Sequence, residues 1–372
     1  MQAAARLGVK PATLYAYVSR GLLPRHRSPD GRTSLFDPDD LARLARRGGG
    51  RQAPSDVTVA SELCLIEEGT LSYRGLDVLR ACRELHFEEI VWWLWTGSLE
   101  RMSTWRADPA SLRAGTRAQS TLPRGAPAAD RLPLIVSAIS AARPRAFGTA
   151  AAGDVMACIA DALGSTPGGS ARYAIRAAGQ RVPGPMVRVI DAALSLTCER
   201  GLTYSSLAAR LATVTGNGVA GAVAAAMQTA APHARAMTVI ESAFERSTAI
   251  TGEALELASS RTLYKDGDPR AALLLAMLAE VAPREAQVVS SVAAGLDDLT
   301  VEFALAGVGW ACGVSSGALL LVARTAGWIA HALEERRNPT SYRPRLAYTG
   351  PPLRATTPRR TLDAVQQYLA RQ

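Results

Sequence analysis

Most of the chain beyond residue 55 carries apolar residues at helical spacing. Val, Ile, Leu and Ala recur three or four positions apart across residues 186–197, 202–231 and 271–280. This spacing places the apolar side chains on one face of a helix, and the pattern repeats along the chain. It predicts a body built from packed helices.

An uncharged stretch from Phe303 to Ala323 is long enough to span a bilayer. Glycines and serines interrupt it between residues 309 and 317, and the charged residues Glu302 and Arg324 stand against its ends. We therefore expect two buried helices with a break between them, and no membrane partner.

The first 47 residues form a separate pattern. Residues 3–8 and 11–20 predict two short helices joined by a tight turn, the helix-turn-helix arrangement. Residues 28–36 predict a hairpin or wing, and Asp37 is placed to cap a third helix. The Gly-rich segment 48–54 predicts a flexible linker.

Charge sets this head apart. Residues 1–51 hold ten Lys or Arg against four acids, which gives them +6 of the chain's net charge of +9. A basic head suits a polyanion such as DNA. The DNA-binding candidates are Thr13, Tyr15, Tyr17, Arg20 and Arg32. The alternatives are an Arg-rich surface without a partner, and a head that only docks on the body or mediates assembly.

Composition supports an all-α fold, since 48% of residues are apolar and only 5% are aromatic. The five cysteines are odd in number and lack metal-ligand spacing. They predict reduced thiols, no metal site and, with no signal peptide in the sequence, a cytoplasmic location.

Four segments carry a resemblance. They are Gly69–Asp77 with the following Phe87–Leu99, then Tyr264–Ala271, Arg324–His331 and Arg343–Gly350. In this order and spacing they resemble citrate synthase, while the head resembles the MerR-type winged helix-turn-helix. The resemblance implies a body at 55–372 with large and small helical domains, the small one at roughly 234–315. It also implies a homodimer with a shared active site.

The family condenses acetyl-CoA or a related acyl-CoA with oxaloacetate, and the resemblance implies no tightly bound cofactor. It places Arg270, Arg324 and Arg343 on the oxaloacetate carboxylates, with Arg343 coming from the second subunit. Guanidinium groups suit this task because their fork matches a carboxylate. Lys265 would contact CoA.

The catalytic positions depart from the family. His233 falls on the enolate-stabilising histidine, Arg261 on the ketone-polarising histidine, and Glu302 on the aspartate base. Glu for Asp moves the carboxylate by roughly an ångström, which can cost on the order of 100-fold in rate. Ser195 and Cys198 replace two further histidines of the substrate site, and Cys198 is expected to be a buried thiol.

Three functions remain open. The first is a weakened citrate synthase-type acyltransferase. The second is a catalytically silent sensor of dicarboxylates or acyl-CoA whose head binds DNA. The third is a non-catalytic partner of an intact citrate synthase.

Overall fold

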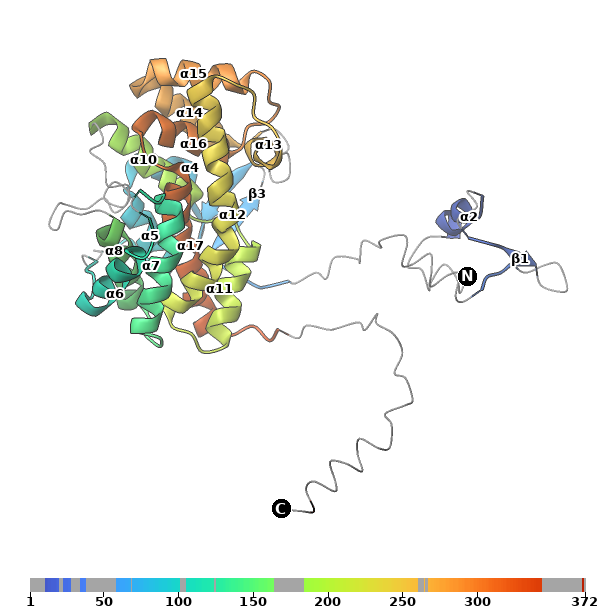
Figure 1. Cartoon of the computed structure of the whole chain (residues 1–372), viewed down its shortest axis with the longest axis horizontal. Helices are drawn as coiled ribbons and strands as arrows, with labels where there is room; N and C mark the ends of the chain where they lie inside the picture. The colour runs from blue at the N-terminus through green and yellow to red at the C-terminus, as the bar shows by residue number, and fades with distance from the viewer. Residues whose placement is uncertain are drawn as a thin grey trace. The chain divides into compact units, whose positions relative to one another are not determined.

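The computed structural model describes residues 11–19, 23–27, 34–37, 58–67, 69–100, 105–123, 125–163, 184–259, 264, 267–342 and 370. The chain divides into two compact units, residues 1–60 and 61–372 (Figure 1).

The first unit contains one described helix and one hairpin. Helix α2 spans Pro11–Ser19, and β1 (His26–Arg27) pairs antiparallel with β2 (Ser34–Leu35). Among the described residues of this unit, Leu14 and Leu23 are the buried apolar side chains. The second helix and the hairpin of the expected head are thus confirmed. The helices expected at 3–8 and after Asp37, and the linker at 48–54, lie outside the described residues.

The body begins with a small antiparallel sheet that the helical pattern did not predict. Its strands are β3 (Cys64–Glu67), β4 (Thr70–Tyr73) and β5 (Leu76–Asp77), in that order. Leu71 and Tyr73 of β4 point into the helical core and are fully buried. The sheet therefore covers part of the helical core.

Helices make up the rest of the described body. The first five are α4 (Val78–Glu84), α5 (Phe87–Thr96), α6 (Pro109–Gln119), α7 (Ala128–Ala142) and α8 (Thr149–Leu163). The following ones are α10 (Gly184–Thr197), α11 (Tyr204–Val214), α12 (Val219–Arg246), α13 (Glu253–Ala258), α14 (Pro269–Val281) and α15 (Pro283–Ala293).

The helical segment expected at 202–231 is two helices. Gly216 adopts a φ of 95°, which the left-handed region allows to glycine, and the chain turns there between α11 and α12. Helix α12 then runs through Pro232 to Arg246 without ending. The expected start of the small domain, residue 234, lies inside this helix.

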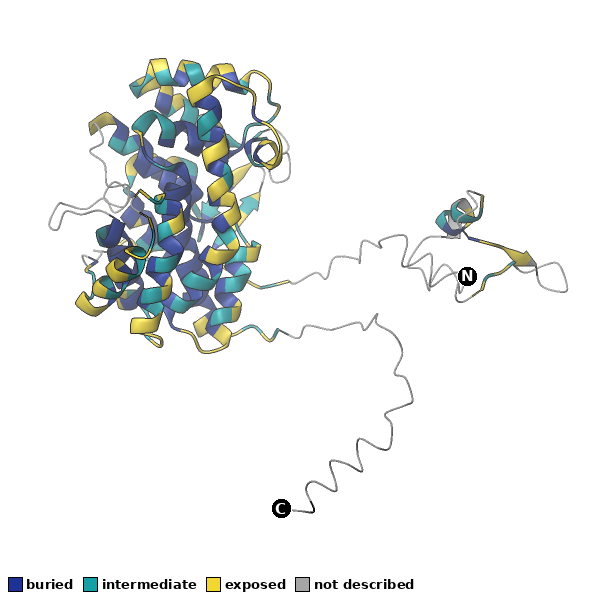
Figure 2. Ribbon diagram, viewed as in Figure 1, coloured by how far each residue is buried: buried dark blue, intermediate teal, exposed yellow. Residues whose placement is uncertain are grey.

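The uncharged stretch forms the centre of the core. Helices α16 (Val301–Cys312) and α17 (Ser316–Arg337) are separated at Gly313, whose φ is 66°. The two buried helices with a break are therefore confirmed. By length and composition α17 could cross a membrane, yet its most apolar stretch is entirely buried inside the body (Figure 2).

Candidate active site

Two adjoining cavities lie beside α12, α16 and α17. The first, of about 410 Å³, is lined by residues of α12, α13, α14 and α16. The second, of about 340 Å³, lies toward α11 and α17. Arg200, His233 and Glu302 line both. These three side chains therefore mark the centre of the candidate site.

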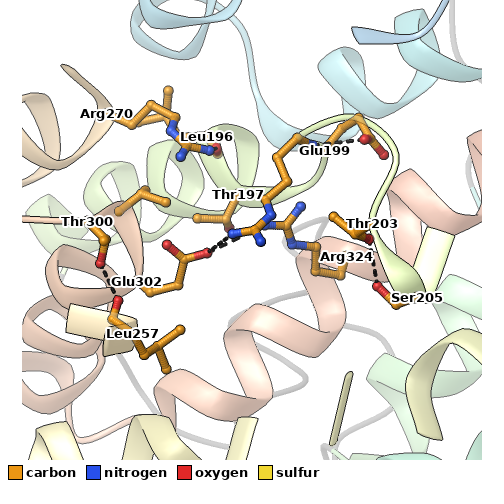
Figure 3. Close-up of polar contacts among 12 residues, drawn as sticks. Leu196, Thr197, Glu199, Thr203, Ser205, Leu257, Arg270, Thr300, Glu302 and Arg324 are labelled. Carbon is orange, nitrogen blue, oxygen red and sulfur yellow. Dashed lines mark hydrogen bonds and ion pairs between the residues drawn. The ribbon is translucent and has the colours of Figure 1, made fainter. Parts of the chain in front are cut away.

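Glu302 enters the site from the first turn of α16. The N-cap Thr300 accepts a hydrogen bond from the Phe303 amide at 3.2 Å and donates to the Leu257 carbonyl at 2.6 Å (Figure 3). The cap fixes the start of the helix and so the direction of the carboxylate. Glu302 is 5% exposed.

Two guanidinium groups converge on one oxygen of Glu302. Arg200 Nη1 lies 3.2 Å and Arg324 Nη2 lies 3.6 Å from Oε1. Burial alone would raise the pKa of Glu302, but Arg200, Arg270 and Arg324 together hold it below its usual value. Glu302 is therefore an ionised carboxylate at neutral pH.

His233 enters the same space from α12, and its ring is exposed to the cavities. Partial burial and the guanidinium groups of Arg200 and Arg324 lower its pKa, against the opposing effect of Glu302. The imidazole is consequently neutral near pH 7, where one ring nitrogen can donate a hydrogen bond.

Arg270 lies in the first turn of α14 and pairs with Asp268, two residues before it. Asp268 caps the helix, and its carboxylate receives Arg270 Nε at 2.9 Å and Nη2 at 2.7 Å. Arg270 also lies over the Tyr264 ring, 5.3 Å from its centroid. The remaining nitrogen, Nη1, points to the Leu196 carbonyl at 3.5 Å (Figure 3).

Each guanidinium group of the site thus contacts a carboxylate of the chain itself. Arg270 pairs with Asp268, while Arg200 and Arg324 share Glu302. The bidentate Arg270 pair is the tighter arrangement, because each oxygen has its own donor. Arg200 and Arg324 make single-point contacts, which an incoming carboxylate can replace more easily.

Two predicted substrate contacts are not brought into this space. Ser195 and Cys198 are fully buried and line neither cavity. Ser195 Oγ donates to the Asp191 carbonyl at 2.8 Å within α10. Burial raises the pKa of Cys198 to about 12, so the expected buried thiol is confirmed.

Some predicted residues fall where the structure gives no description. Arg261, Lys265, Arg343, Arg20 and Arg32 lie outside the described residues. On α2, Thr13 and Tyr17 are half-buried and Tyr15 is 52% exposed. Within the described residues, no group of three or more His, Cys, Asp or Glu side chains is placed to hold a metal ion.

Sequence reasoning missed Arg200, Asp268 and Tyr264. Arg200 lies two residues after Cys198, and only the fold of the loop between α10 and α11 brings it to Glu302. Asp268 could have been found, since Asp-Pro-Arg at a helix start predicts a cap. Tyr264 is 5% exposed, and its hydroxyl has no hydrogen-bond partner in the described structure.

A helical body that surrounds a carboxylate and an imidazole with arginines defines a class of anion-binding, acid–base sites. The model of the citrate synthase C-terminal domain family matches residues 55–345, and the chain belongs to the citrate synthase family. A helix-turn-helix domain model matches residues 2–49. No curated protein sequence matches the chain.

Solved structures agree on the fold. Citrate synthase from Thermotoga maritima is 19% identical with a TM-score of 0.61, covering 82% of this chain and 97% of its own. The Thermoplasma acidophilum enzyme, a ternary complex with carboxymethyl coenzyme A and oxaloacetate, is 18% identical with a TM-score of 0.65 and the same coverage. The Pyrobaculum aerophilum enzyme is 17% identical with a TM-score of 0.60, covering 91% and 97%.

Proposed function

We propose that the body is a citrate synthase-type acyltransferase that condenses acetyl-CoA, or a related acyl-CoA, with oxaloacetate at a low rate. The observation that carries this proposal is the meeting of Glu302 and His233 at the same two cavities, which Arg200 also lines. An ionised carboxylate and a neutral imidazole are the two groups needed to form and stabilise an enolate.

In this proposal each side chain has one role. Glu302 removes a proton from the carbon next to the thioester, and His233 donates a hydrogen bond to the oxygen that becomes negative. The enolate carbon then attacks the ketone carbon of oxaloacetate, the ketone oxygen takes up a proton, and water hydrolyses the thioester to release CoA. The carboxylates of oxaloacetate would replace Glu302 as partners of Arg200 and Arg324, and Arg343 of a second subunit would complete the clamp.

The low rate follows from the pairing of the base. A carboxylate whose pKa is lowered by guanidinium groups holds a proton weakly, so proton removal from carbon has little driving force. Binding of the dianion beside Glu302 counters this by adding negative charge. Oxaloacetate would therefore bind first and activate the base.

The test is release of free thiol from acetyl- or propionyl-CoA in the presence of oxaloacetate. We expect a slow rate that falls at least about 100-fold in Glu302→Gln and in His233→Ala, since each removes one catalytic group. Glu256→Gln, a carboxylate at the rim of the same cavity, serves as the matched control and should retain the rate. Full activity in Glu302→Gln would exclude the base role.

A second function is favoured by a different observation. The helix-turn-helix match at residues 2–49, together with a site whose arginines are already paired, suits a silent dicarboxylate sensor that binds DNA. Such a protein releases no thiol, yet oxaloacetate or citrate changes its affinity for DNA. DNA binding that weakens steeply with salt and responds to either ligand supports this function, and the absence of both excludes it.

A further inference from the structure

A buried cluster of charged side chains joins α11 to α17. Arg210 of α11 is 1% exposed and contacts three residues of α17. Its guanidinium pairs with Glu334 and, at 2.8 Å, with Glu335, while Nε donates to His331 Nδ1 at 2.9 Å. All of its charge is thus satisfied inside the protein.

The hydrogen bond from Arg210 decides the state of His331. Because Nδ1 accepts it, the ring proton is on Nε2. That nitrogen lies 3.1 Å from Glu199 Oε2. This close polar contact, an ion-pair distance without hydrogen-bond geometry, joins His331 to the Glu199 carboxylate, which is 2% exposed.

The other oxygen of Glu199 binds backbone amides of the site loop, residues 198–203 between α10 and α11. Oε1 accepts from the amide of Arg200 at 2.8 Å and from that of Gly201 at 2.6 Å. Arg200 in turn reaches Glu302 at 3.2 Å. Arg210 therefore contacts His331, His331 contacts Glu199, and Glu199 binds the loop whose Arg200 reaches the candidate base.

We propose that His331 is a positioning residue: it orients Glu199, which fixes the loop from which Arg200 reaches Glu302 and an incoming carboxylate. The binding part of this inference rests on the proposed function, whereas the loop part does not. His331 touches neither cavity.

The backbone of Glu199 has a separate anchor, so the two effects can be told apart. The Tyr73 hydroxyl donates to the Glu199 carbonyl at 2.9 Å and accepts from its amide at 3.2 Å. Loss of the His331 contact should therefore leave residue 199 in place and free only the amides of Arg200 and Gly201.

Two substitutions at one position isolate the contact. In His331→Asn the amide oxygen stands near the position of Nδ1 and still accepts from Arg210, but the side chain is too short to reach Glu199. In His331→Gln the amide NH₂ stands near the position of Nε2 and donates to Glu199. His86→Leu, which removes a 2.8 Å contact with Asp191 elsewhere in the body, is the matched control.

The first measurement is amide hydrogen exchange of the full chain, resolved at Arg200 and Gly201. We expect exchange at least about tenfold faster in His331→Asn, and near wild type in His331→Gln and His86→Leu. The second is oxaloacetate affinity by calorimetry, with a loss of about tenfold in His331→Asn alone, as for one charge-assisted hydrogen bond.

pH adds a test that a merely structural role would not pass. Burial raises the pKa of Glu199, but His331, Arg324 and the Arg200 amide more than offset it and lower that pKa. Without His331 the pKa of Glu199 rises, so protection of the two amides should be lost at a higher pH in His331→Asn than in the wild type. The titratable or charged groups that face Glu199 in the described structure are His331, Arg324, Arg200, Tyr73, Cys198 and Cys64.

The outcomes separate the two proposals. Equal amide protection in all variants overturns the positioning role of His331, whatever the affinity. If exchange is faster in His331→Asn but the wild-type protein binds no oxaloacetate, the positioning role stands and the proposed function is excluded.

Discussion

At the residue scale, the protonation of Glu302 depends most strongly on one loop arginine, Arg200. Among the groups that lower the pKa of Glu302, Arg200 has the largest effect. Its side chain is 31% exposed, whereas that of Arg324 is 11% exposed, so Arg200 is the more accessible of the two partners. Changing Arg200 should therefore alter the charge of the site with little change in packing.

We expect Arg200→Gln to raise the pKa of Glu302. The sign follows because the variant keeps the burial that raises this pKa and loses the strongest opposing guanidinium. Carbon-13 NMR titration of labelled glutamate measures the shift directly, and the acidic limb of the pH–rate profile should move to higher pH. Arg80→Gln, an exposed arginine paired with Glu84, is the control. An unmoved Glu302 titration in Arg200→Gln would contradict the assignment.

At the element scale, α17 packs against the site loop through a glycine. A Cβ on Gly327 would lie 2.1 Å from the Cys198 carbonyl oxygen and 2.6 Å from Glu199 Oε2. Neither neighbour can move easily, because both belong to the buried end of α10 and its loop. The approach of these two elements thus requires glycine.

Gly327→Ala should lower the free energy of unfolding by about 1–3 kcal/mol, the usual cost of overpacking a core. Urea denaturation measures the change. Gly295→Ala is a suitable control, because no atom lies within 4 Å of its Cβ position and its φ is ordinary. If Gly327→Ala were as stable as the wild type, the tight packing of α17 on the Cys198–Glu199 backbone would be wrong.

The sequence predicted the helices of the body better than it predicted the side-chain contacts of the site. Apolar spacing identified α10, α14, α16 and α17, and the family resemblance identified Glu302 and His233, which do line the same cavities. Arg200 could not be predicted, because its reach to Glu302 depends on how Glu199 and His331 hold the loop. Ser195 satisfies its hydroxyl on its own helix and stays buried, which motif position alone does not reveal.

At the scale of the whole molecule, the Arg210 cluster joins segments that are distant in sequence. Glu334 accepts from the Glu62 amide and the Ser61 hydroxyl, each at 2.8 Å, where the body begins. Glu335 accepts from the Thr340 amide at 2.5 Å and the Tyr342 hydroxyl at 3.1 Å, beyond the end of α17. One arginine therefore supports both ends of the described body as well as the site loop.

Acid should weaken this arrangement. Although burial raises the pKa of Glu334, its hydrogen bonds to Glu62, Ser61 and Arg210 lower it overall, and the pKa values of Glu199 and Glu302 are lowered as well. A lowered folded-state pKa gives stability that is present above the unfolded value of 4.5 and is lost as pH falls through the folded value. The melting temperature of the full chain should therefore drop below about pH 4.5.

Arg210→Met should reverse the sign of this dependence for the cluster. At pH 7 the variant leaves Glu334 and Glu335 buried without their guanidinium, which costs about 3–5 kcal/mol of unfolding free energy. Burial then raises the pKa of Glu334, so protonation relieves the penalty and the stability gap to the wild type narrows as pH falls from 7 toward 5. Denaturant unfolding at several pH values measures the gap, with Arg80→Met, at the exposed pair with Glu84, as control. A gap that stays constant over this range would mean that Glu334 does not depend on Arg210 for its charge.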